Sequence, residues 1–156
     1  GTAVAKRLCA FDAMIFANDI VEKDPSIIEK YCIKMVNKEE IYEQCDFITL
    51  HCDLNESSHH LLNRKVFAKM NDSAYIINTA RGPIVKEDDL IDALREGVIA
   101  GAGLDVFEHE PLPVDSLLRK MSHTILSSHN SNSSPMHWQR VHENSIKMLL
   151  KGLGIG

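Results

Sequence analysis

The sequence predicts an α/β fold in which helices flank a doubly wound parallel β-sheet. Short apolar runs alternate with helical patterns between residues 13 and 106, which is typical of parallel strands joined by helices. The run 75–82 (YIINTARG) shows this most clearly, because Gly82-Pro83 ends it abruptly. With 156 residues, 44% of them hydrophobic, the chain is expected to form one domain with a sizeable core.

The N-terminal residues have the pattern of the back half of a dinucleotide-binding unit. Residues 1–11 are expected to form a helix that opens on Gly1, and residues 13–17 a short strand that ends before Asp19. In such a unit the glycine lies beside the cofactor and the acid binds the ribose hydroxyls of adenosine. No arginine stands beside Asp19, which favours NAD over NADP. A plain turn residue is an equal alternative for Asp19.

The first strand and the first two glycines of such a unit are not found at the N-terminus. We therefore expect a Rossmann-like sheet that lacks its first strand and exposes strand edges on both sides of the gap. The chain is interpreted as a partial NAD-binding domain over residues 1–156, cut from a larger protein. Alone, such a chain is expected to be poorly stable or to associate.

The remaining elements follow in chain order. Further strands are expected at 32–36, 46–52, 98–106 and 124–127. Further helices are expected at 37–45, 63–70, 86–96, 115–121 and 134–150. Asn37, Asn63 and Ser134 have the chemistry of helix N-caps, and Gly97 that of a helix terminator.

Composition and residue spacing argue against several classes of function. A formal net charge of -5 without a long basic run argues against nucleic acid or an anionic membrane as partner. No apolar stretch reaches the length of a spanning helix, and the N-terminus has no signal pattern, so a cytoplasmic location is expected. The four cysteines and eight histidines show no metal-binding spacing, so no metal site is expected.

Three residues of complementary chemistry follow three successive predicted strands: Arg81, Glu110 and His129. A carboxylate beside an imidazole favours the protonated ring and fixes its orientation, as a general acid requires near neutral pH. The planar guanidinium of Arg81 suits a carboxylate. For a 2-keto acid, Arg81 would hold the carboxylate while His129 protonates the carbonyl oxygen and a nicotinamide supplies hydride to the carbon. Each residue could instead have a purely structural role. Arg81 could form an ion pair with a nearby acid, Glu110 could be a solvent-exposed loop residue, and His129 could bond to the backbone.

Three segments carry a family resemblance: 77–85 (INTARGPIV), 101–113 (GAGLDVFEHEPLP) and 127–129 (SSH). They closely resemble the signatures of the D-isomer-specific 2-hydroxyacid dehydrogenases, and the resemblance covers essentially the whole chain. It implies that Arg81 binds the substrate, that His129 is the catalytic histidine and that Glu110 is its acidic partner.

The resemblance also implies an NAD site, a small 2-hydroxy or 2-keto acid as substrate, and a homodimer. Arg81 and His129 would contact the cofactor as well as the substrate. The other implied cofactor-binding residues are Gly1, Asp19, His51, Cys52, Thr79, Ala80 and Asp105.

The chain departs from the family pattern at three places. Asp53 stands where relatives usually have proline, and the segment 130–134 (NSNSS) is unusually polar. The substrate domain of the family is absent from this chain. The sequence therefore does not identify which 2-keto acid is reduced. An alternative also stays open: the protein is an NAD-sensing, corepressor-like binding protein without physiological turnover.

Overall fold

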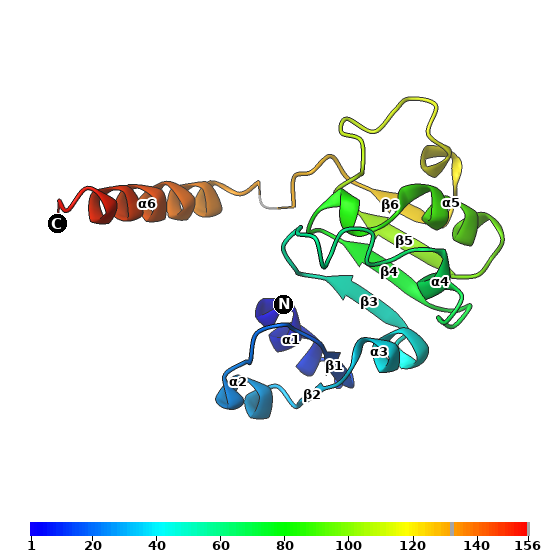
Figure 1. The fold of residues 1–156 in the computed structure, drawn as a ribbon, viewed down its shortest axis with the longest axis horizontal. Helices are drawn as coiled ribbons and strands as arrows, with labels where there is room; N and C mark the ends of the chain where they lie inside the picture. The colour runs from blue at the N-terminus through cyan, green and yellow to red at the C-terminus, as the bar shows by residue number, and fades with distance from the viewer. Residues whose placement is uncertain (132, 156) are drawn as a thin grey trace.

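The structure is a computed structural model, which describes residues 1–131 and 133–155 (Figure 1). Its main body is a parallel four-stranded sheet in the order β3-β4-β5-β6. These strands are β3 (Phe47–Leu50), β4 (Tyr75–Asn78), β5 (Gly101–Leu104) and β6 (Thr124–Leu126). The predicted parallel sheet with flanking helices is thus confirmed.

The first two strands form a sheet of their own. β1 (Ile15–Ala17) pairs in parallel with β2 (Ile33–Met35), and neither pairs with β3. Figure 1 shows this small sheet, with α1 (Thr2–Cys9) and α2 (Pro25–Lys30), lying beyond β3. The gap between β1 and β3 falls where the first strand of a doubly wound sheet belongs. Among the residues that the structure describes, the expected break in the sheet is confirmed.

Helices α4 (Arg64–Phe67) and α5 (Glu87–Arg95) cover one face of the four-stranded sheet. Phe67 of α4 and Leu90 of α5 are 1% exposed and belong to the same core cluster as Ile76 of β4, which is 0% exposed. Full burial of one such side chain contributes about 1.5–3 kcal/mol, so packing on this face stabilises the body.

Burial on β3 and β4 alternates from residue to residue. Phe47, Tyr75 and Ile125 are 67%, 40% and 78% exposed, and the rings of Phe47 and Tyr75 stack at 5.4 Å. These three side chains point to the sheet face opposite α4 and α5, because successive residues of a strand alternate between faces.

The predicted helix ends are confirmed at several points. Asn37 Oδ1 accepts the N–H of Glu40 at 2.9 Å at the start of α3 (Lys38–Gln44), and Asn63 caps α4. Gly97 follows α5 with φ +69°. The helix expected at 115–121 is instead the four-residue 3₁₀-helix η2 (Leu117–Lys120), like the shorter η1 (Gly82–Ile84) before α5.

The last helix, α6 (Pro135–Gly152), begins at the predicted cap Ser134 and extends away from the body (Figure 1). It buries no residue, and its Trp138 and Met148 are 55% and 75% exposed. Within residues 1–131 and 133–155, no helix combines the length and the apolar character that crossing a bilayer requires.

Candidate active site

The candidate site lies at the carboxyl edge of the four-stranded sheet. Because β3 to β6 are parallel, their carboxyl ends share this edge, where ligands bind in open α/β sheets. His51, Arg81, Asp105 and His129 follow β3, β4, β5 and β6 in turn. Most of the site residues predicted from the sequence therefore lie at one edge of the sheet.

Glu110 and His129, 19 residues apart, form a direct pair. Glu110 Oε2 lies 2.7 Å from His129 Nδ1, and Glu110 Oε1 accepts the backbone N–H of Phe107 at 3.0 Å. The hydrogen bond with His129, helped by that from Phe107, lowers the pKa of the Glu110 carboxyl. The carboxylate is thus charged at neutral pH and holds the imidazole through Nδ1, which leaves Nε2 to exchange a proton with a ligand.

The backbone at His129 is held by Asp105. His129 has φ +57°, a left-handed conformation that few residues other than glycine adopt, although histidine does so more often than most. The carboxylate of Asp105, which is 4% exposed, accepts the N–H groups of Asn130 and Ser131 at 3.0 Å each. Burial raises the pKa of Asp105, but hydrogen bonds from Ser131 and Asn130 outweigh it and lower the pKa to about 2.

This role of Asp105 escaped the sequence reasoning, which placed the residue at the nicotinamide end. No sequence signal marks the contact, because the donors are backbone groups 25 and 26 residues away. A contact between Asp105 and the cofactor stays a prediction.

Arg81 is exposed and follows β4, where its Nη1 donates to the carbonyl oxygen of Ala80 at 2.6 Å. The next residue, Gly82, lies against the loop that carries Glu110: a Cβ on Gly82 would lie 1.8 Å from the Phe107 carbonyl oxygen. The structure thus joins Glu110 and His129 directly and brings the Arg81 segment against the same loop.

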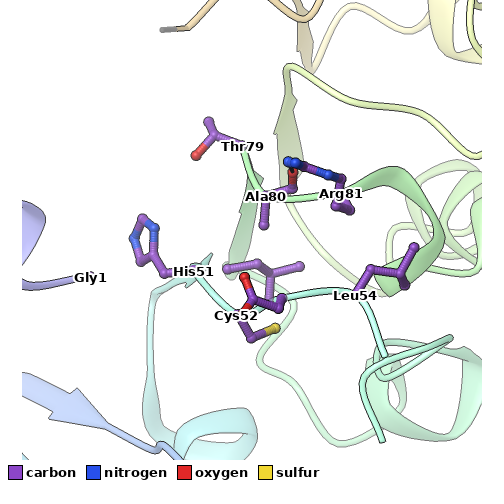
Figure 2. A pocket seen from close by; sticks show the side chains of 9 residues that line it. Gly1, His51, Cys52, Leu54, Thr79, Ala80 and Arg81 are labelled. Atoms are coloured by element: carbon purple, nitrogen blue, oxygen red, sulfur yellow. Dashed lines mark hydrogen bonds between the residues drawn. The ribbon is translucent and has the colours of Figure 1, made fainter. Parts of the chain in front are cut away.

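A pocket of about 460 Å³ opens beside Arg81 and is lined mainly by residues predicted to bind the cofactor. Figure 2 shows the segment 79–81 on one side, His51 and Cys52 across the opening, and Gly1 beyond them. The volume lies within the 300–1,000 Å³ or so that is usual for ligand sites. Gly1 is the N-cap of the eight-residue α1, and helix N-termini attract phosphate groups. The residues present therefore fit part of a dinucleotide.

At this pocket, burial governs the charge of His51. It lowers the pKa of His51, whose Nε2 lies 3.1 Å from Thr49 Oγ1, so this ring is neutral at pH 7. The permanent positive charge at the pocket is that of Arg81.

Asp19, the predicted ribose-binding acid, does not line this pocket. Its Oδ2 lies 2.7 Å from Lys23 Nζ and its Oδ1 accepts the N–H of Val21 at 3.0 Å, and these contacts lower its pKa. The spacing of four residues between Asp19 and Lys23 is the signal of this ion pair in the sequence. The role of Asp19 stays a prediction.

Two departures from the family pattern also lie at this edge. Asp53 lines the pocket, and its carbonyl oxygen accepts Ser58 Oγ at 2.6 Å. Asn130 accepts Ser127 Oγ at 2.7 Å through its Oδ1. Asn132, in the polar segment 130–134, and Gly156, at the end of the predicted domain, lie outside the described residues.

Comparisons with known proteins agree with this geometry. The glyoxylate reductase of Thermofilum pendens is 37% identical over 150 residues, which cover 96% of this chain and 44% of that protein. The hydroxypyruvate reductase of Thermotoga maritima is 36% identical over 158 residues, covering 99% and 50%. The D-lactate dehydrogenase of Lactobacillus jensenii, solved with NAD+, matches with a TM-score of 0.87 at 29% identity and covers 100% of this chain and 50% of its own.

The chain spans about half the length of the relatives it matches. Residues 1–131 match the sequence model of one family, described as the D-isomer specific 2-hydroxyacid dehydrogenase, NAD binding domain. With the parallel sheet and the paired Glu110 and His129 at its carboxyl edge, this match shows that the chain belongs to the D-isomer specific 2-hydroxyacid dehydrogenase family.

Proposed function

We propose that the protein containing this chain is an NAD-dependent oxidoreductase that transfers a hydride between NAD(H) and a small 2-hydroxy or 2-keto acid. The observation that carries the proposal is the 2.7 Å contact between Glu110 and His129 at the edge where Arg81 meets the pocket. An oriented imidazole beside a permanent cation suits a substrate that carries both a carboxylate and a reactive carbonyl.

In the proposed reduction, Arg81 binds the substrate carboxylate and orients the carbonyl. The charged Glu110 contacts Nδ1 of His129 and fixes its ring, and Nε2 donates a proton to the carbonyl oxygen. NADH, when bound, supplies the hydride to the carbonyl carbon. In the oxidising direction His129 Nε2 takes the proton from the substrate hydroxyl, and Arg81 keeps the same contact.

We further propose which residues hold NAD and how the chain fits into the protein. Gly1, His51, Cys52, Thr79 and Ala80 would line the cofactor site, a role supported by their shared pocket, while Asp19 and Asp105 would contact the ribose and the nicotinamide. Residues 1–156 would form most of the NAD-binding domain, and another part of the protein would supply the substrate domain.

The protein would act in the cytoplasm as a homodimer. The exposed apolar side chains Phe47, Tyr75 and Ile125 on the open sheet face support association, because surfaces of this kind are usually covered. Equilibrium sedimentation of the protein that contains this chain tests the dimer. A monomer at all concentrations would contradict it.

The alternative, an NAD sensor without turnover, is not favoured, because the relatives are named as reductases and dehydrogenases. NADH oxidation is the discriminating assay, with a panel of 2-keto acids that begins with glyoxylate and hydroxypyruvate. We expect turnover on at least one acid, and we expect His129→Ala to abolish it while NADH still binds. Binding of NADH without turnover on any acid would favour the sensor.

A further inference from the structure

A second hydrogen-bonded group lies beside the proposed catalytic pair, and we call it the Glu108 bracket: His60, Glu87 and Glu108. Glu108 Oε1 lies 2.6 Å from His60 Nε2, and Glu108 Oε2 accepts the backbone N–H of Glu87 at 2.6 Å. In return, the backbone N–H of Glu108 donates to Glu87 Oε2 at 3.1 Å. Both oxygens of Glu108 and its backbone N–H are therefore engaged.

The bracket joins three segments that lie far apart in the sequence. His60 belongs to the loop between β3 and α4, Glu87 is the first residue of α5, and Glu108 follows β5. The backbone of His60 is fixed as well, because its backbone N–H donates to the carbonyl oxygen of Pro83 at 2.8 Å. The loop after β5 is thus anchored to two other parts of the body.

The bracket is partly shielded from water, so its hydrogen bonds are stronger than surface contacts. The side chains of His60 and Glu108 are 33% and 21% exposed. Burial raises the pKa of the Glu87 carboxyl and the nearby charge of Glu108 adds to the rise, whereas the hydrogen bond from the backbone N–H of Glu108 opposes it. The carboxylates of Glu87 and Glu108 lie close together and repel each other. The imidazole of His60 and the backbone N–H of Glu87 offset this repulsion by binding Glu108.

The anchored loop is the one that positions Glu110. Glu108 and Glu110 are two residues apart, and the N–H of Phe107, the residue before Glu108, donates to Glu110 Oε1 at 3.0 Å. The other oxygen of Glu110 contacts His129. A shift of residues 107 and 108 would therefore move Glu110 relative to the imidazole.

We infer that Glu108, held by His60 and Glu87, is a positioning residue that fixes the loop of Glu110 and so orients His129 for proton transfer. The inference rests on the proposed function, because it concerns the same reaction. Glu108 acts through Glu110, since its own hydrogen bonds go to His60 and Glu87.

The test uses two variants of the full protein that break the bracket in different ways. Glu108→Gln removes the charge that pairs with His60 and keeps the size of the side chain. His60→Asn shortens the side chain so that it no longer reaches Glu108, and asparagine tolerates the positive φ of 50° at this position. Glu43→Gln, an exposed carboxylate on α3, is the matched control.

We expect both variants to lower kcat for reduction of a 2-keto acid by about 10- to 100-fold, the size of effect that small misplacements of a catalytic group produce. The Kd for NADH is expected to stay within about twofold, because the bracket lies outside the pocket. The pKa of Glu110 can be followed by ¹³C NMR of its carboxyl carbon. It is expected to rise as contact with His129 weakens. The charge of Asp105, which also acts on Glu110, is the same in both variants. Glu43→Gln is expected to change none of the three quantities.

Folded variants with the wild-type kcat and the wild-type pKa of Glu110 would overturn the inference. A loss of NADH affinity as large as the loss of kcat would also overturn it, because it would indicate a general structural role. Should the wild-type protein reduce no 2-keto acid, the proposed function fails, whereas the pKa of Glu110 still shows whether the bracket positions this residue.

Discussion

At the scale of single residues, the Glu110 and His129 pair was predictable, whereas the support around it was not. Both residue types carry recognisable chemistry and follow predicted strands, so the shared edge of a parallel sheet could be inferred. Asp105 is different, because it binds backbone N–H groups of the turn after His129, which any residue could supply. His60 and Glu108 lie 48 residues apart, and their contact depends on how two loops pack.

Asp105 leads to a prediction about stability and pH. Its pKa is lowered to about 2 from its ordinary value of 3.8, so its charged form stabilises the fold by about 2 kcal/mol above pH 4. Because the folded-state pKa is the lower one, this stabilisation is lost as pH falls from about 4 towards 2. Asp105→Asn should therefore lower the free energy of unfolding at pH 7 by about 2 kcal/mol, with a shrinking difference below pH 4.

Urea unfolding followed by circular dichroism across this pH range measures the effect. The exposed Asp115→Asn is the control and should change the unfolding free energy little. A difference between Asp105→Asn and wild type that stays constant from pH 7 to about pH 2 would show that the charge of Asp105 is not what holds the turn.

At the scale of elements, the sequence predicted where helices begin and end better than which strand faces are covered. A cap such as Asn37 depends on the local backbone, so its signal lies within a few residues. The exposure of Phe47 and Tyr75 depends on which elements pack on the sheet, which an apolar run does not encode. The short η2 replaces the helix expected at 115–121, because the N–H groups of Ser116, Arg119 and Met121 bond to carbonyl oxygens three residues back, as in a 3₁₀-helix.

The close approach of two loops gives the prediction at this scale. A Cβ on Gly82 would lie 1.8 Å from the carbonyl oxygen of Phe107 and 2.6 Å from the N atom of Glu108, both backbone atoms that cannot move alone. Gly82→Ala should separate the Arg81 segment from the loop of Glu110 and lower the free energy of unfolding by about 1–3 kcal/mol. It should also reduce turnover, because Arg81 would be displaced relative to Glu110 and the substrate could not contact both Arg81 and His129 correctly.

Gly152→Ala in α6 is the matched control, because nothing lies within 4 Å of a Cβ there. Alanine at that helical position should be neutral or stabilising by up to about 1 kcal/mol. Thermal unfolding and steady-state kinetics of both variants provide the comparison. Equal stability and turnover for Gly82→Ala and wild type would contradict the packing described.

At the scale of the whole molecule, the chain exposes more surface than a compact domain of its mass. Its accessible surface is 10653 Å², whereas a monomeric protein of 17.5 kDa is expected to expose about 7,900 Å². Three features account for the excess: the gap between β1 and β3, the open sheet face and the projecting α6. The sequence predicted the first of these, because the missing strand could be inferred from the fingerprint.

This excess leads to a prediction for the 156-residue chain by itself. We expect the isolated chain to self-associate or to unfold at low temperature, because exposed strand edges and apolar side chains favour pairing with another chain. Size-exclusion chromatography with light scattering, together with calorimetry, measures both properties. A monomer that unfolds in one cooperative transition at a temperature usual for small domains would contradict this expectation.

The most direct test of the proposed catalytic site is the single-turnover rate of hydride transfer from bound NADH to a 2-keto acid. The full protein is compared with its Arg81→Gln, Glu110→Gln and His129→Gln variants. We predict that the Glu110 and His129 variants bind NADH normally but transfer hydride about 100-fold more slowly or worse, since general acid catalysis contributes roughly 10²–10⁴-fold. Arg81→Gln should mainly weaken binding of the keto acid. Wild-type rates of hydride transfer in the His129 and Glu110 variants would contradict the assignment of this pair as the proton donor.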